Sequence, residues 1–188
     1  MESISLRALY EIAEDQMGFV TSAQAVDAGV RPMALVMLER RGRIDRVSHG
    51  VYRLKEFPVS PLAQYMQAIL WPRGPRGVLS HETALALYEL SDIDPPKVHI
   101  TLPPHFRVQR EVPSYLVVHR AALSESDVTR FEGMPITTPA RSIRDCIAAH
   151  VGPAIISDAI EQASRSGMIS PAEAERLQTE LRTPAEYV

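Results

Sequence analysis

Apolar residues in the first part of the chain recur at helical spacing. Ile4, Leu6 and Leu9 begin a pattern that makes one face of a helix apolar, and it continues to Ala13. A glycine shortly afterwards marks the end of the pattern. We therefore expect a first helix over residues 5–17.

A capping box follows at Thr21 and Gln24. In this motif the threonine hydroxyl accepts the backbone NH three residues on, and the glutamine side chain reaches back to the backbone NH of the threonine. The motif predicts a short helix over residues 22–28, and Gly29 is a suitable residue to end it.

A third helix is predicted over residues 33–41, between Pro32 and Gly42. Proline loses no hydrogen bond in the first turn of a helix, and glycine suits the position after the last turn. The second and third helices are then joined by a short turn that contains glycine, as in a helix-turn-helix. After Gly42, alternating residues predict two strands, 43–47 and 51–54, which would form a wing.

The rest of the chain predicts a mixture of helices and strands. Helices are expected over 60–71, 80–90, 153–165 and 170–182 and from Thr138 onwards, strands over 97–102 and 114–120, and a turn over 133–137. Of the 15 prolines only Pro32 precedes residue 58, so we place a boundary within Lys55–Pro61. The predicted fold class is α+β, with an N-terminal winged helix-turn-helix over 1–57. A mixed α/β C-terminal domain with a small sheet and several helices would occupy 58–188.

Composition excludes several classes of protein. The chain has 188 residues, of which 45% are hydrophobic and 23% are charged, as in ordinary globular proteins. The longest apolar run, Met33–Leu38, is far shorter than the roughly 18 residues of a membrane span, and the charged start lacks a signal-peptide core, so we expect a cytoplasmic protein without a membrane partner. The single cysteine, Cys146, excludes an intramolecular disulfide and a cysteine-rich zinc site.

The net charge of −3 conceals a basic segment. Residues 29–55 contain seven basic residues and only two acidic ones, Glu39 and Asp45. On the third helix Leu35 and Leu38 share the face that can pack inward, which leaves the arginines and methionines nearer to solvent. Such a helix can enter the major groove of DNA, with the wing near phosphates. The predicted DNA-binding residues are Ser22, Arg31, Met33, Met37, Arg40, Arg41, Arg43, Arg46, His49 and Arg53.

Two other interpretations of this domain stay open. The basic segment is also compatible with a solvated face, and a winged helix can act purely as a protein-interaction module. If the domain binds DNA, a single module buries only about 600–1,000 Å². Two copies on repeated half-sites are then expected, so we predict self-association on DNA.

Signatures of an enzyme are missing. His81 and Glu82 lack the second histidine of a zinc-protease helix, and no Gly-x-Ser-x-Gly elbow or phosphate-binding glycine loop is present. His99 and His119 can face one another on neighbouring strands, but no third ligand for zinc is suggested. We therefore predict no catalytic residue, metal or cofactor, and keep a metal-dependent hydrolase only as a remote alternative. Hydrogen-bonded structural histidines explain the pattern better.

Five segments in order resemble the AbiEi-type antitoxins of bacterial type IV toxin-antitoxin systems. The resemblance covers residues 5 to about 150, and the segments are Arg43–Tyr52, Leu79–Leu85, Val98–Thr101, Val118–Arg120 and Gly133–Asp145. It implies an N-terminal domain that binds inverted repeats in its own promoter and a C-terminal domain that counteracts a nucleotidyltransferase-like toxin. It also implies that the antitoxin is itself not an enzyme.

Candidate residues of the antitoxin domain follow from the same resemblance: Ser80, His81, Arg141, Arg144 and Asp145. Each also has a structural interpretation. Ser80 can cap a helix with His81 as a polar contact in the first turn, and Arg141 and Asp145 are four residues apart and can pair with each other. Two alternatives to the full function remain: a stand-alone winged-helix regulator, and an antitoxin that binds only protein.

Overall fold

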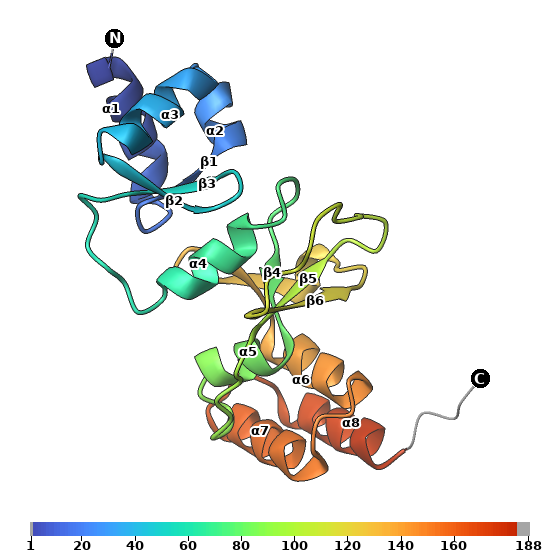
Figure 1. Ribbon diagram of the computed structural model, residues 1–188. Coiled ribbons are helices and arrows are strands. Elements are labelled where there is room, and N and C mark those ends of the chain that lie inside the picture. Colours follow the sequence, from blue (N-terminus) through green and yellow to red (C-terminus); the bar gives the residue numbers. More distant parts are fainter. Residues whose placement is uncertain (1, 184–188) are drawn as a thin grey trace. The chain divides into compact units, whose positions relative to one another are not determined.

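The chain divides between Gly77 and Val78 into two compact units. The computed structural model describes residues 2–183 (Figure 1). The first unit combines helices with a three-stranded sheet and the second combines a mixed five-stranded sheet with helices, so the predicted α+β class is confirmed. The elements of the first unit are α1 (Glu2–Glu14), β1 (Phe19–Thr21), α2 (Ser22–Asp27), α3 (Pro32–Arg40), β2 (Ile44–Ser48), β3 (Val51–Leu54) and α4 (Ala63–Leu70).

Local signals place α2 and α3 as expected. The Gln24 backbone NH donates to the Thr21 hydroxyl at 3.2 Å, and the Thr21 NH donates to the Gln24 side-chain oxygen at 2.9 Å, so the capping box is confirmed. Pro32 is the first residue of α3, and Gly42 follows its end with a φ of +68°. The helix-turn-helix therefore rests on contacts between residues that are close in sequence.

The sheet of the first unit has one strand more than the predicted wing. Its order is β1-β3-β2, with β3 antiparallel to both neighbours. The two wing strands are confirmed as β2 and β3. The additional strand β1 contains only three residues, Phe19–Thr21, which is too short for an alternating pattern to be recognised. It is a strand because the central strand supplies its hydrogen-bond partners.

The core of the first unit lies between α1, α3 and the sheet. Its largest fully buried side chains are Leu9, Leu35, Leu38, Ile44 and Leu54.

The first helix ends earlier than its apolar pattern predicts, at Glu14 instead of residue 17. Met17 and Gly18 both adopt positive φ, and the Gly18 NH donates to the Ala13 carbonyl at 2.9 Å. A Cβ added to Gly18 would lie 2.6 Å from Cβ of Phe57. The chain therefore turns sharply here and packs closely against the segment that follows β3.

The first compact unit extends beyond the Lys55–Pro61 segment, where the proline pattern places the boundary. Helix α4 contacts β1, and Arg76 donates a hydrogen bond to the buried side chain of Gln16. Gln16 in turn donates to the Phe19 carbonyl at 3.0 Å. Residues up to Gly77 are thus attached to the winged helix by contacts that the local sequence does not indicate.

The second unit contains a sheet of order β6-β5-β4-β8-β7. Strand β4 runs antiparallel to β5 and parallel to β8, β5 and β6 are parallel, and β7 and β8 form a hairpin. The strands are β4 (Val78–Leu79), β5 (Val98–Leu102), β6 (Leu116–Arg120), β7 (Val128–Phe131) and β8 (Met134–Thr137). The predicted strands at β5 and β6 are confirmed, whereas the predicted turn over 133–137 is wrong. The turn is at Glu132 and Gly133, which both have positive φ, and the following residues form β8.

Helices of the second unit gather on one side of its sheet (Figure 1). They are α5 (His81–Leu87), α6 (Pro139–Ala148), α7 (Pro153–Arg165) and α8 (Pro171–Arg182), with a short 3₁₀ turn at Glu125–Asp127. Ile143, Ile156, Ile160 and Leu177 are buried between them, together with Cys146. In the described residues, no helix has both the length and the apolar character needed to cross a membrane.

Candidate functional site

Helix α3 presents a stripe of three side chains to solvent. Leu35 and Leu38 are buried on the opposite face, each 2% exposed. The outward stripe consists of Met33, which is 69% exposed, Met37, which is 40% exposed, and the exposed Arg40. Their spacing of four and three residues is that of one helix face, so the stripe points directly away from the core.

Basic groups stand at both ends of α3. Arg31 is the N-cap residue of α3 and Arg40 is in its last turn, and both are exposed. Neither pairs with a carboxylate of another described residue. At the tip of the wing the Arg46 guanidinium lies 2.8 Å from Nδ1 of His49, and both side chains are exposed.

Other basic residues of the segment have structural partners. Arg43 pairs with Glu56, and Lys55 pairs with Asp45 at 3.1 Å. Because each of these cations meets a carboxylate, the wing has fewer unpaired cations than the number of its basic residues suggests.

Arg53 is also held by its surroundings. Its guanidinium donates to the carbonyls of Phe57 and Pro58 at 2.8 and 2.9 Å and lies 6.0 Å from the centre of the Phe19 ring. The Ser22 NH donates to the Gly50 carbonyl at 2.9 Å and links α2 to the wing turn. Of the predicted DNA-binding residues, the structure therefore leaves Met33, Met37 and Arg40 on one open face, with Arg31 exposed at the N-cap and Arg41 exposed at the C-cap of the same helix.

Three histidines and a glutamate meet in the second unit. Nδ1 of His99 lies 2.8 Å from a Glu82 carboxylate oxygen and 3.1 Å from Nε2 of His119. The His81 ring stacks on the His119 ring, with centroids 3.4 Å apart and planes inclined by 12°. The prediction that His99 and His119 face one another is confirmed. The sequence does not predict that His81 and Glu82 join them. Both residues are at the start of α5, just after β4, and only the pairing of β4 with β5 brings them next to His99.

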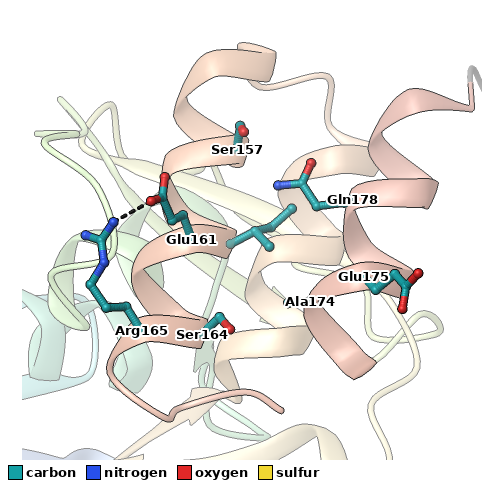
Figure 2. Close-up of a pocket in the computed structure, with 8 residues that line it drawn as sticks. Ser157, Glu161, Ser164, Arg165, Ala174, Glu175 and Gln178 are labelled. Carbon is teal, nitrogen blue, oxygen red and sulfur yellow. Dashed lines mark hydrogen bonds and ion pairs between the residues drawn. The ribbon is translucent and has the colours of Figure 1, made fainter. Parts of the chain in front are cut away.

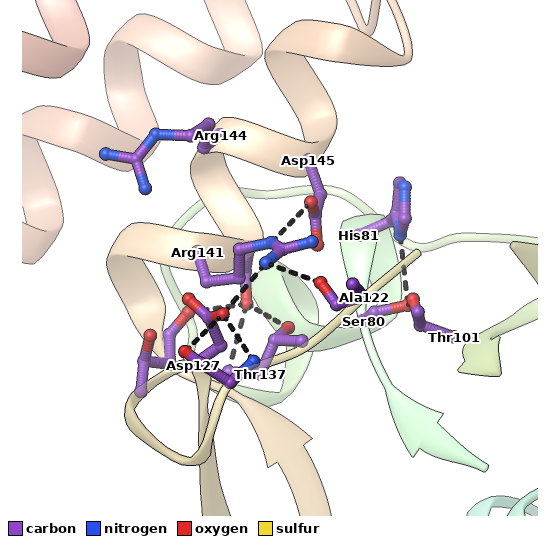
Figure 3. A network of polar contacts seen from close by, with 12 residues as sticks. Ser80, His81, Thr101, Ala122, Asp127, Thr137, Arg141, Arg144 and Asp145 are labelled. Carbon is purple, nitrogen blue, oxygen red and sulfur yellow. Dashed lines mark hydrogen bonds and ion pairs between the residues drawn. The ribbon is translucent and has the colours of Figure 1, made fainter. Parts of the chain in front are cut away.

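Ser80 has a different role from the predicted helix cap. It precedes α5, but its hydroxyl makes no capping hydrogen bond. The hydroxyl instead accepts from Thr101 at 2.8 Å and lies 3.0 Å from Nδ1 of His81 (Figure 3). His81 is 7% exposed and has a φ of +53°, a conformation that costs energy for a residue other than glycine. The cap prediction is wrong, because the hydroxyl bonds to Thr101 on β5 and not to the first turn of α5.

Burial makes the three histidine rings hard to protonate. Desolvation, with smaller contributions from His119, His99 and Arg141, lowers the pKa of His81 to about 3. Desolvation and the neighbouring His99 lower the pKa of His119 to about 4. The pKa of His99 is lowered by burial as well, against the opposing effect of Glu82. His81 and His119 are therefore neutral at pH 7.

The histidine cluster does not have the geometry of a metal site. Among the residues that the structure describes, no three histidine, cysteine or acidic side chains are arranged to hold a metal ion. The sulfur of Cys146 is buried in mid-helix, and burial raises the pKa of its thiol.

Arg141 is the centre of a second polar network (Figure 3). Its guanidinium donates to Asp145 at 2.8 Å, to Asp127 at 3.0 Å and to the carbonyl of Ala122 at 3.3 Å. The predicted pairing of Arg141 with Asp145 is confirmed. Arg144 points elsewhere and pairs with Glu180 at 3.1 Å.

The two carboxyl groups that Arg141 binds differ in their titration. Hydrogen bonds from Ser124, and then the nearby guanidinium, lower the pKa of Asp127, although partial desolvation opposes them. Burial raises the pKa of Asp145 despite its bond to Arg141. Because Asp127 belongs to the 3₁₀ turn before β7 and Asp145 belongs to α6, their bonds to Arg141 join these two elements.

A shallow groove of about 450 Å³ lies between α7 and α8 (Figure 2). Its lining mixes charged and small residues, and Glu161 and Arg165 at one side pair with each other. It contains no group that suggests a particular ligand.

Comparison with known proteins finds a family that the N-terminal part resembles. Residues 7–55 match the family model described as "Transcriptional regulator, AbiEi antitoxin". Among solved structures, the chain is similar to the crystal structure of the RV2827C protein from Mycobacterium tuberculosis, with a TM-score of 0.44 and 18% identity over 97% of this chain and 83% of that chain. No curated protein matches the sequence. The matched segment contains α2, α3, the wing and all the predicted DNA-binding residues, so the likeness to this family of antitoxin transcriptional regulators covers the helix-turn-helix and wing of the first unit.

Proposed function

We propose that this chain is the antitoxin of a type IV-like toxin-antitoxin system and represses its own operon. In this proposal the first unit binds inverted repeats in promoter DNA, and the second unit counteracts a nucleotidyltransferase-type toxin. The observation that carries the proposal is the open face of α3, with Arg31 and Arg40 at its ends, in a domain that matches an antitoxin and regulator family. A regulator of this kind performs no catalysis.

The shape of the first unit suits duplex DNA. The major groove is about 12 Å wide and admits one α-helix, and the N-terminal residues of such a helix approach the base edges. Helix α3 begins with an exposed arginine cap, which favours contact with phosphate at that end. Arg46 and His49 at the wing tip supply further donors. Two copies on an inverted repeat would provide the area that one module lacks.

In this proposal the second unit acts on the toxin mainly through residues outside the predicted set. Ser80, His81, Arg141 and Asp145 all bind partners inside the unit, so we expect them to support the fold. Arg144 is the exception among the five candidates, because its side chain is 46% exposed and its pair with Glu180 is a surface contact. A toxin could compete for such a contact at little cost.

The DNA-binding part is tested by gel shift with DNA from upstream of the gene. Replacing Arg31, Arg40 and Arg46 together by alanine should abolish the shift and leave rescue from the toxin intact. If weakened binding persists, the slope of log affinity against log salt should fall by about 0.9 for each phosphate that the variant no longer neutralises. A control variant replaces three exposed arginines of the second unit, Arg107, Arg176 and Arg182, and removes the same charge.

The triple variant and the wild-type chain together separate the alternatives. If the triple variant of the first unit binds DNA with unchanged affinity and salt slope, the assigned surface is wrong. If the wild-type chain binds no upstream DNA and still neutralises the toxin, the protein is an antitoxin that acts only by protein contact. If it binds DNA but rescues no cell from the product of the adjacent gene, it is a stand-alone regulator.

A further inference from the structure

Two of the three side chains in the outward stripe of α3 are apolar. Met33 and Met37 lie one turn apart and are 69% and 40% exposed. The core contacts of this helix come from Leu35 and Leu38, and neither methionine belongs to the core cluster of the first unit, so the exposed parts of both side chains are available to a partner. The two methionines therefore form a small apolar surface that an apolar group outside the chain can contact.

We propose that Met33 and Met37 recognise the C5-methyl groups of thymines in the major groove; this rests on the proposed DNA binding. A thioether side chain donates no hydrogen bond and is a weak acceptor, so it cannot read the donor and acceptor code of the base edges. The feature of a base edge that suits an apolar side chain is the thymine methyl. Methionine is flexible and polarisable enough to follow such a group.

The charges around the stripe favour DNA over a protein partner. Arg31 precedes Met33 and Arg40 follows Met37 along the same helix, so the apolar pair lies between two cations. This order matches a groove in which base edges lie between two phosphate backbones. Two methionines alone are far less than the roughly 800 Å² per partner of a stable protein interface.

The experiment compares thymine with uracil, which differ only in this methyl group. Duplexes are first selected from a random pool by the full chain, and each thymine of the selected half-site is then replaced in turn by deoxyuridine. Removal of one recognised methyl should weaken binding about fourfold, the value expected for burial of one carbon group. In the variant M33A M37A the ratio of thymine to uracil affinity should fall to near one.

Matched variants keep the test specific. Alanine is a good helix former, so M33A M37A should keep the melting temperature of the wild type. Met168 is 44% exposed in the second unit, and M168A should retain the full preference for thymine. A double-mutant cycle between each methionine and each thymine assigns the pairs.

Each outcome bears on a different claim. If uracil duplexes bind as tightly as thymine duplexes while R31A still weakens binding, DNA binding stands and methyl recognition is overturned. If M33A M37A leaves DNA affinity unchanged but abolishes association with a protein, the stripe is a protein-docking surface and the inference is overturned. If the full chain selects no duplex, the DNA-binding part of the proposed function fails together with the inference.

Discussion

The histidine cluster of the second unit should make the stability of that unit strongly dependent on pH. His81 and His119 have pKa values of about 3 and about 4 in the folded chain, and an unfolded histidine has a pKa near 6.5. Between these values the unfolded chain binds more protons than the folded chain, so acid favours unfolding. The stabilising contribution is therefore complete above about pH 6.5 and is lost as the pH falls towards 4 and then 3.

The size of the effect at pH 5 follows from the unfolded pKa. Both folded pKa values lie a unit or more below pH 5, so each ring stays neutral in the fold and is almost fully protonated once unfolded. At 1.36 kcal/mol per pH unit, the buried His81 then costs about 2 kcal/mol relative to pH 8, and the half-buried His119 adds a smaller cost because solvent screens its charge. This is a large fraction of the roughly 5–15 kcal/mol that stabilises a typical domain.

The free energy of unfolding is to be measured by urea titration at pH 8, 6.5 and 5. Hydrogen exchange of amides in β5 and β6 assigns the transition to the second unit. H81N should remove more than half of the pH dependence, because asparagine tolerates the positive φ at this position and does not titrate. H105Q, at an exposed residue outside the cluster, should retain the dependence of the wild type.

Two results would refute this reasoning. A loss of less than about 1 kcal/mol between pH 8 and pH 5 would mean that the rings protonate without penalty in the fold. A full pH dependence in H81N would mean that the effect comes from other groups.

Three further predictions concern the fold, each measured as the free energy of unfolding. T21A should cost about 1 kcal/mol, because the helix cap is lost, and an unchanged stability would show that the cap contributes nothing. G18A should cost more than G29A: both residues have positive φ, which costs about 1–2 kcal/mol in alanine, but only at Gly18 would the new Cβ meet a side chain, so equal costs would contradict the close approach. R141A should cost about 3 kcal/mol by leaving two carboxylates without their cation, whereas R144A, which breaks an exposed pair, should cost less than about 1 kcal/mol; the reverse order would contradict the assigned burial.

The sequence by itself determines the winged helix and most of the helices. The capping box at Thr21, the proline that opens α3 and the glycine that follows it act over three to five residues, so their effect is visible without any tertiary contact. Helix α7 spans residues 153–165 as predicted for the same reason. The open face of α3 is equally predictable, because helical periodicity assigns Leu35 and Leu38 to the core.

The tertiary structure alone decides the features that depend on which segments become neighbours. Strands β1 and β4 have three and two residues and owe their conformation to the strands that pair with them. Pairing of β4 with β5 brings Glu82 and His81 to His99, and the loop after β3 supplies the carbonyls that hold Arg53. Strand order and the partners of buried polar groups depend on the burial of whole faces across the chain, and no local pattern encodes that choice.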